Sequence, residues 1–204
     1  MRIAVAGAGI QGASIALELA RRGHRVDLYD RQGTAFSRAS GSNEGKLHLG
    51  LVYGNDPSLR TARMVLRGSL SFAPIVERWI PSFAARVPHS NPFDYLVHRD
   101  SLITQDKLAA HFAAVAGLYR EEIAAPGARY FKAAKEAPDF VCERMPDSAC
   151  AARFDSHCVR AAWRSIERSI DPRSVATLFR EALAAEPKIS FFPRHTVAEA
   201  RARN

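Results

Sequence analysis

The amino-acid sequence predicts an α/β fold built on a parallel β-sheet, and three observations lead to this prediction. A short apolar run opens the chain, a glycine-rich turn and a largely apolar stretch of helical spacing follow, and a second apolar run ends in an acidic residue. Near the end of the chain, a helical pattern again precedes an apolar run, which is the order of elements typical of parallel sheets. The C-terminal stretch is therefore expected to add a helix and a strand in the order of a βαβ unit.

The run Arg2–Ala6 is short, apolar and partly β-branched, as in a strand that is buried on both faces of a parallel sheet. Gly7, Gly9 and Gly12 follow it with the spacing G-x-G-x-x-G. Gly7 permits a tight turn, Gly9 lets a pyrophosphate approach the backbone, and Gly12 lets a helix lie close to the strand. The motif alone is a weak signal, but its place between a predicted strand and a predicted helix indicates a dinucleotide site.

The helix is predicted over about residues 10–22, and Gly23 is placed to end it in a left-handed conformation. The run "HRVDLYD" then predicts a second strand, which Asp30 closes. An acid at this position accepts hydrogen bonds from the ribose hydroxyls of a dinucleotide. Its charge would repel a 2′-phosphate, which disfavours NADP, although the adjacent Arg31 leaves this choice open.

These first thirty residues do not distinguish NAD from FAD, because both cofactors offer the same ADP half. The next informative stretch is "SRASGSNEGKLHLGLVYG" over residues 37–54, in which a loop rich in glycine and serine leads to alternating leucines interrupted by His48. Backbone N–H groups in such a loop could cradle a phosphate or the edge of a flavin. An ordinary flexible loop explains the same composition equally well.

The glycine motif, Asp30 and the run "ASGSNEGKLHLG" resemble the FAD-dependent oxidoreductases of the D-amino-acid oxidase family, which includes glycine oxidase, sarcosine oxidase and L-2-hydroxyglutarate oxidase. The longer run "SNEGKLHLGLVYGNDPSLRTA" is most similar in layout to the 2-hydroxyglutarate oxidase branch. The resemblance implies FAD as the cofactor, a Rossmann-type domain, and oxidation of a small amine, amino acid or 2-hydroxy acid. A catalytically inactive dinucleotide-binding fragment and an NAD-dependent dehydrogenase are the alternatives.

The resemblance also implies roles for single residues. Gly7, Gly9 and Gly12 would surround the pyrophosphate, and Asp30 would bind the adenosine ribose. His48 is the predicted catalytic residue, since a histidine near this point lies beside the flavin in relatives and is attached to it in some; a core histidine held by a hydrogen bond is the alternative. The other residues expected to line the cofactor are Arg31, Ser40, Asn43, Gly45, Lys46, Leu47 and Val197.

Further helix and strand signals follow the loop. Asp56 and Pro57 are typical of an N-cap and a first helical residue, and the helix they open is expected to end or kink at Pro74, with "IVERWI" continuing it to Pro81. The later elements expected are a strand at residues 95–97, a helix capped by Thr104, a strand at about 158–165, a helix opened by Pro172 and a strand at 189–192.

The resemblance divides the chain into three segments. Residues 1–73 and 171–204 are expected to form the FAD-binding domain, and residues 74–170 the first part of a substrate domain inserted into it. The resemblance covers about the first half of a family member, so the fold is expected to be truncated at its C-terminus. A second chain that completes the fold is therefore one expected partner, beside a small-molecule substrate.

Composition and charge weigh against several other classes of protein. The hydrophobic content of 47% can supply a core. The net charge of +8 is spread along the chain without a block of like charge, which disfavours nucleic-acid binding. No apolar run approaches the ~20 residues of a membrane span. The three cysteines show neither a disulfide framework nor metal-ligand spacing, so we expect a cytoplasmic protein without a metal site.

Overall fold

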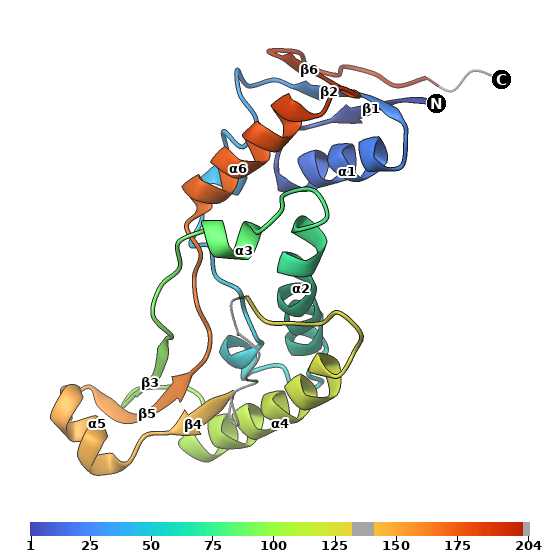
Figure 1. Ribbon diagram of the computed structural model, residues 1–204. Helices are drawn as coiled ribbons and strands as arrows, with labels where there is room; N and C mark the ends of the chain where they lie inside the picture. The colour runs from blue at the N-terminus through green and yellow to red at the C-terminus, as the bar shows by residue number, and fades with distance from the viewer. Residues whose placement is uncertain (132–140, 202–204) are drawn as a thin grey trace. The chain divides into compact units, whose positions relative to one another are not determined.

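The computed structural model describes residues 1–131 and 141–201, which form two compact units (Figure 1). Unit 1 comprises Met1–Gly45, Ile75–Pro88 and Ile170–Asn204, and unit 2 comprises Lys46–Pro74 and His89–Ser169. The boundaries of these units do not coincide with those of the three predicted segments, because residues 46–73 group with unit 2, and residues 75–88 and Ile170 with unit 1. The division into FAD-binding and substrate segments is a functional assignment and stays a prediction.

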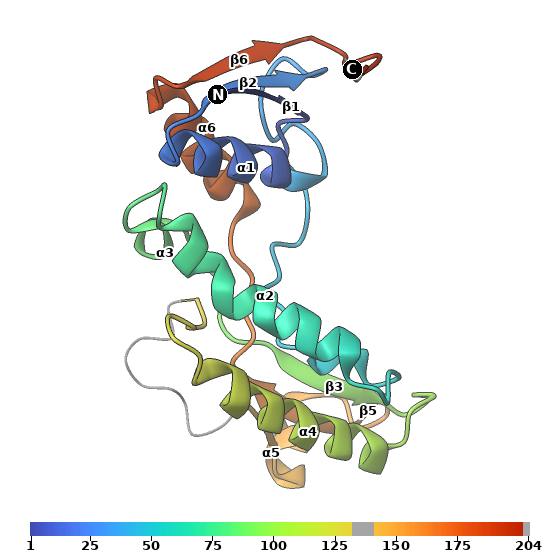
Figure 2. The same ribbon diagram turned by 90° about the vertical axis from the view of Figure 1, so that its right-hand side faces the viewer.

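Unit 1 is built on a parallel three-stranded sheet of β1 (Arg2–Ala6), β2 (Arg25–Asp30) and β6 (Ile189–Pro193), in the order β1-β2-β6. The helices α1 (Ile10–Arg21) and α6 (Pro172–Ala185) pack against the same face of this sheet (Figure 2). All five elements were predicted from the sequence, and the α/β fold with a parallel sheet is confirmed. The α1 helix ends as expected, because Gly23 has a φ of 93°.

The core of unit 1 lies between its sheet and its helices. Leu28 of β2 and Ala13 of α1 are fully buried, since each is 0% exposed. The ring of Phe179 on α6 packs against the ring of Phe36, with 5.0 Å between their centres, and against that of Phe83 at 6.5 Å. Phe83 begins α3 (Phe83–Arg86), a short helix that the sequence did not predict. Apolar burial thus ties the two chain ends and residues 75–88 into one unit.

The first turn of α6 is capped by Asp171. Its carboxylate accepts hydrogen bonds from the Ser174 hydroxyl at 2.6 Å and from the backbone N–H groups of Ser174 and Arg173 at 2.9 and 3.3 Å. These bonds, the Ser174 hydroxyl first, lower the pKa of Asp171. Asp171 therefore satisfies N–H groups that a helix leaves unpaired, and it does so best as a carboxylate.

Replacing Asp171 by alanine is expected to lower the free energy of unfolding by about 1 kcal/mol at neutral pH, because the cap is lost. A group with a lowered folded pKa stabilises above its unfolded pKa of about 3.9, and this stabilisation disappears as pH falls through the folded value. Urea unfolding at pH 7 and pH 3 measures both effects. Asp171→Asn is the control: it should keep the cap and lose this part of the pH dependence.

Unit 2 contains an antiparallel sheet of β3 (Asp94–His98), β5 (Val159–Ser165) and β4 (Cys142–Arg144), in the order β3-β5-β4. The helix α4 (Gln105–Ile123) packs on this sheet, with the Phe112 ring 5.3 Å from that of Trp163. The Thr104 hydroxyl caps α4 by accepting the Lys107 N–H. These features confirm β3, β5 and α4, whereas β4 and α5 (Asp147–Arg153) were not predicted.

The helix α2 (Arg60–Val76) starts later than predicted. Leu59 has a φ of 55°, which interrupts the helical conformation between Pro57 and Arg60. Asp56 still serves the helix, because its carboxylate accepts the N–H of Thr61 at 3.1 Å. Asp56 therefore binds an N–H in the first turn of the helix, as a capping residue does, but the helix begins at Arg60 and not at Pro57 as predicted.

The other end of α2 also differs from the prediction. Pro74 lies inside α2, and the helix ends at Val76 instead of continuing to Pro81. Proline has no N–H, so the carbonyl of Leu70, four residues earlier, loses its helical partner. That carbonyl accepts the N–H of Arg129 at 3.0 Å.

Within residues 1–131 and 141–201, no helix is both long and apolar enough to cross a membrane.

Candidate functional site

An open pocket of about 300 Å³ lies at the carboxyl ends of the parallel strands in unit 1. The glycine turn after β1, the end of β2, the loop over residues 36–40 and the segment after β6 form its walls. Ligands of open α/β sheets bind at this end of the strands. Six of the predicted cofactor residues line the pocket, namely Gly7, Gly9, Asp30, Arg31, Ser40 and Val197.

The glycine turn has the geometry that the motif predicts. Gly7 has a φ of 94°, and a Cβ atom at Gly12 would lie 1.8 Å from the carbonyl oxygen of Gly7, which no side chain permits. A Cβ at Gly9 would lie 3.0 Å from the Ser40 hydroxyl oxygen, which itself accepts the N–H of Ile10 at 3.0 Å. The absent side chain of Gly9 thus leaves a cradle between the start of α1 and Ser40.

Asp30 joins the end of β2 to the glycine turn. One carboxylate oxygen accepts the N–H of Ala8 at 2.6 Å, and the other accepts the N–H of Gln32 at 2.7 Å. A carboxylate has about four acceptor positions, so each oxygen keeps capacity for a ligand hydroxyl. The carbonyl of Asp30 accepts the N–H of His195, which holds the segment after β6 beside the pocket.

Aromatic rings at the pocket were missed by the sequence reasoning. Tyr29 and His195 line the pocket, and the Tyr29 ring stacks on Phe192 with 4.9 Å between the ring centres. The Phe192 ring is also 5.9 Å from that of His195. Their position directly at or after the ends of β2 and β6 was the available signal, because parallel strands bring these ends together.

Asn43 and Gly45 belong to unit 1 and serve the backbone of their own loop. The Asn43 side chain donates to the Ala39 carbonyl at 2.8 Å and accepts the Gly45 N–H at 2.7 Å. Gly45 has a φ of 61°, and a Cβ there would lie 1.9 Å from the carbonyl oxygen of Ile170. These contacts explain why both residues suit the loop, and their contact with a cofactor stays a prediction.

Lys46, Leu47 and His48 belong to unit 2. Lys46 pairs with Ser169 as an antiparallel β-bridge, and the Leu47 N–H donates to the carbonyl of Arg168 at 3.0 Å. The Tyr130 hydroxyl ties the same two segments, since it donates to the Leu47 carbonyl at 2.8 Å and accepts the Arg168 N–H at 2.9 Å. Contacts with Ser169, Arg168 and Tyr130 therefore hold the backbone before His48 in place.

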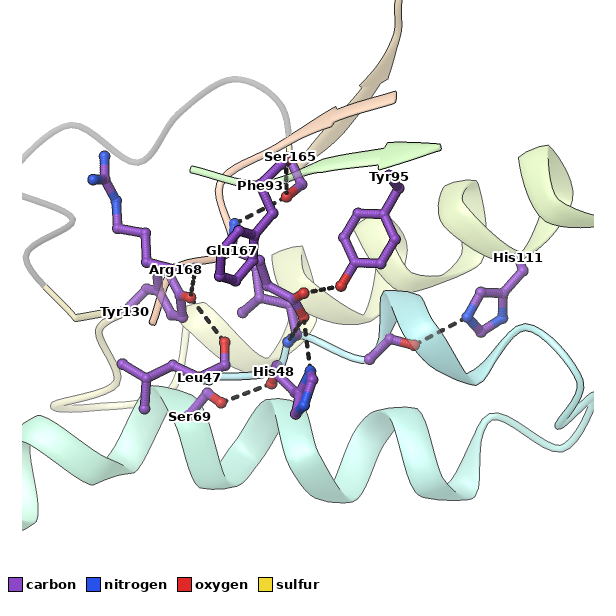
Figure 3. A network of polar contacts seen from close by, with 12 residues as sticks. Leu47, His48, Ser69, Phe93, Tyr95, His111, Tyr130, Ser165, Glu167 and Arg168 are labelled. Atoms are coloured by element: carbon purple, nitrogen blue, oxygen red, sulfur yellow. Dashed lines mark hydrogen bonds and ion pairs between the residues drawn. The ribbon is translucent and has the colours of Figure 1, made fainter. Parts of the chain in front are cut away.

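His48 faces a buried acid, Glu167, which the sequence reasoning also missed (Figure 3). Glu167 is 1% exposed, and its carboxylate accepts hydrogen bonds from the Leu49 N–H and the Tyr95 hydroxyl. The His48 Nδ1 atom lies 3.7 Å from the same carboxylate, while the His48 side chain is 29% exposed. An acid within the run "WRSIERSI" gave little sign in the sequence that it would be buried.

Burial controls the other titratable groups around Glu167. Burial, and then the negative charge of Glu167, raise the pKa of the Tyr95 phenol, which therefore stays protonated and donates its hydrogen bond. Burial also raises the pKa of Tyr130. For Cys142, burial and then Glu167 raise the thiol pKa to about 12, so this cysteine is a poor nucleophile at neutral pH.

Comparison with known proteins places the whole chain in one family. The family model described as FAD dependent oxidoreductase matches residues 2–204. A tRNA 5-methylaminomethyl-2-thiouridine biosynthesis bifunctional protein from Shewanella amazonensis is 34% identical over 93 residues, which are 46% of this chain and 12% of that protein. A D-amino acid dehydrogenase from Cereibacter sphaeroides is 48% identical over 50 residues, 24% of this chain and 12% of that protein.

Solved structures share the fold at low sequence identity. Glycine oxidase from Geobacillus kaustophilus superposes with a TM-score of 0.60 at 18% identity, covering 95% of this chain and 47% of that one. Iminodiacetate oxidase from Chelativorans sp. BNC1 gives a TM-score of 0.56 at 20% identity, covering 94% and 46%. The chain thus spans about half the length of these structures. The match to an FAD-dependent family gives no support to the NAD-dependent alternative.

Proposed function

The chain belongs to the family of FAD-dependent oxidoreductases, and we propose that its unit 1 binds the ADP half of FAD for the oxidation of a small amine, amino acid or 2-hydroxy acid. The observation that carries this proposal is the cradle at Gly9, where a Cβ would come within 3.0 Å of the Ser40 hydroxyl oxygen. Space at this point, beside the first N–H groups of α1, suits a pyrophosphate.

The residues around the cradle fit the remaining parts of the ADP half. Asp30 has acceptor capacity for ribose hydroxyls, and its two backbone hydrogen bonds hold its carboxylate in place. Arg31 and Arg38 line the same pocket and would offset phosphate charge. Tyr29 and Val197 offer apolar surface to an adenine ring. Asn43, Gly45, Lys46 and Leu47 are proposed to serve the cofactor towards its flavin end.

Bound FAD would supply the redox chemistry by accepting a hydride from the substrate carbon. His48 is proposed as the residue that handles a substrate proton, which is supported by its partly exposed ring and by the buried carboxylate behind it. Among the substrate classes, we favour an amino acid, because the D-amino acid dehydrogenase is 48% identical to this chain over 50 residues.

We propose the cytoplasm as the location, since all three cysteines, Cys142, Cys150 and Cys158, are free thiols, as a reducing compartment would keep them. Partnership with a small-molecule substrate follows from the proposed activity. A second chain that completes the fold stays a prediction.

The test uses the full chain purified in the presence of FAD and then freed of unbound cofactor. The proposal expects flavin absorbance to remain with the protein, and anaerobic addition of glycine, sarcosine, D-alanine or L-2-hydroxyglutarate to bleach it with one of these substrates. Folded protein that retains no flavin would contradict the FAD site. Flavin retained without bleaching by any of the four would instead favour the inactive dinucleotide-binding alternative.

A further inference from the structure

The carboxylate of Glu167 is buried in the interior of unit 2. It is 1% exposed, and a buried carboxylate is costly unless donors satisfy it. The donors come from two other segments: the backbone N–H of Leu49 reaches one oxygen, and the Tyr95 hydroxyl of β3 reaches the other. Each oxygen is thus held from a different side, and the carboxylate cannot rotate without breaking one of these bonds.

His48 presents a second unusual group to this carboxylate. Its Nδ1 atom is buried and has no hydrogen-bond partner among the described residues, which is unfavourable for a polar atom. The Glu167 oxygen that accepts the Leu49 N–H lies 3.7 Å from this Nδ1, and it retains acceptor capacity. The backbone of His48 is held in place, because the Ser69 hydroxyl donates a hydrogen bond to the His48 carbonyl at 2.7 Å (Figure 3).

We propose that Glu167 is a positioning residue that keeps the proton of the neutral His48 ring on Nδ1, which leaves the lone pair on Nε2. A small rotation of the ring closes the remaining gap to the carboxylate. An acid that fixes the tautomer of a histidine in this way also stabilises the imidazolium when the ring takes up a proton.

The role of the His48–Glu167 pair in catalysis rests on the proposed function. As the substrate loses a hydride to FAD, its N–H or O–H bond breaks and the proton moves to Nε2 of His48, so that one C–H and one N–H or O–H bond are replaced by a carbon–heteroatom double bond. The positive charge gained by the ring then lies beside the negative charge of Glu167. The tautomer itself does not depend on whether the chain turns over a substrate.

The test measures the ring directly, by ¹⁵N NMR of the full chain labelled at its histidines, at a pH where the ring is neutral. His48 is one of 7 histidines, and its signals are assigned by their loss in His48→Gln. We expect a protonated Nδ1 and an unprotonated Nε2 in the wild type. Glu167→Leu should shift the proton towards Nε2, which free histidine prefers. A wild-type ring protonated on Nε2, or an unchanged tautomer in Glu167→Leu, would overturn the proposal.

Glu167→Gln keeps the test decisive if Glu167→Leu does not fold. Its amide oxygen can still accept hydrogen bonds from Leu49 and His48, so the tautomer should persist. Because the negative charge is lost, kcat should fall at least about tenfold, with little change in KM.

Glu143→Gln replaces an exposed acid on β4; it is the matched control and should change neither the tautomer nor kcat. A wild type without turnover would count against the proposed function only, because the tautomer is measured separately. A Glu167→Gln ring protonated on Nε2 contradicts the positioning role.

Discussion

Replacing Gly12 by alanine is expected to lower the free energy of unfolding by about 3 kcal/mol and to abolish FAD binding. The added Cβ would lie 1.8 Å from the carbonyl oxygen of Gly7 and 2.9 Å from its carbon, so backbone atoms and not a flexible side chain are in the way. The turn cannot move freely, because the Gly7 N–H is bonded to the Tyr29 carbonyl at 2.8 Å. Urea unfolding and a fluorescence titration with FAD measure the two effects.

Gly68→Ala is the matched control for this substitution. Gly68 is exposed on α2, and apart from its chain neighbours and the backbone of its own helix, no described atom lies within 4 Å of a Cβ placed there. Since alanine favours a helix over glycine, this variant should be more stable than the wild type by up to about 1 kcal/mol and should bind FAD normally. If Gly12→Ala unfolded at the same urea concentration as the wild type, the close packing of α1 on the glycine turn would be wrong.

Asp30→Ala is expected to weaken FAD binding by about 2–3 kcal/mol, which is roughly 30- to 150-fold in Kd. The substitution removes the proposed acceptor for the ribose and leaves the N–H groups of Ala8 and Gln32 without their carboxylate partner. Gln32 lines the pocket, and Ala8 lies between the lining residues Gly7 and Gly9, so the loss acts on the cofactor and on the shape of its site. Isothermal titration calorimetry with FAD measures the change.

Asp155→Ala provides the comparison for Asp30→Ala. Asp155 also accepts the N–H of the residue two positions later, that of His157 at 2.8 Å, but it lies in unit 2 and is exposed. It should therefore bind FAD like the wild type. Equal Kd values for Asp30→Ala and the wild type would remove Asp30 from the site.

The sequence was sufficient to predict the parallel sheet of unit 1 and its helices α1 and α6, because each of these elements carries a local signal. Gly7, Gly12 and Gly23 hold backbone conformations or contacts that only glycine tolerates, and Asp171 and Pro172 mark the start of α6. Such signals do not depend on distant parts of the chain. The strand order β1-β2-β6 agrees with the same strand–helix–strand pattern.

Unit 2 was harder to predict, because its features depend on long-range contacts. The strand β4 has only three residues and exists through its pairing with β5, whose residues lie about 20 positions further along the chain. The start of α2 depends on the positive φ of Leu59, a conformation that leucine rarely adopts. Neither feature leaves a periodic pattern in the sequence.

The candidate site residues also include some that carry a local sequence signal and some that depend on long-range contacts. Among the pocket residues, Gly9 and Asp30 follow from the dinucleotide motif and Ser40 from the family resemblance, whereas Glu167 becomes visible only when the structure brings it next to His48. Within the sequence these two residues are separated by more than half of the chain. The two donors to Glu167 are the Leu49 N–H, next to His48, and the Tyr95 hydroxyl of β3, so the network joins three stretches of the chain that local patterns could not connect.

Calorimetric titration of the folded 204-residue chain with FAD, and separately with NAD, tests whether unit 1 carries a site for FAD. We expect saturable binding of FAD, which ADP reduces by competition because it occupies the pocket at Gly9, and much weaker binding of NAD. Folded chain that binds no FAD, or that binds NAD as tightly as FAD, would contradict this expectation.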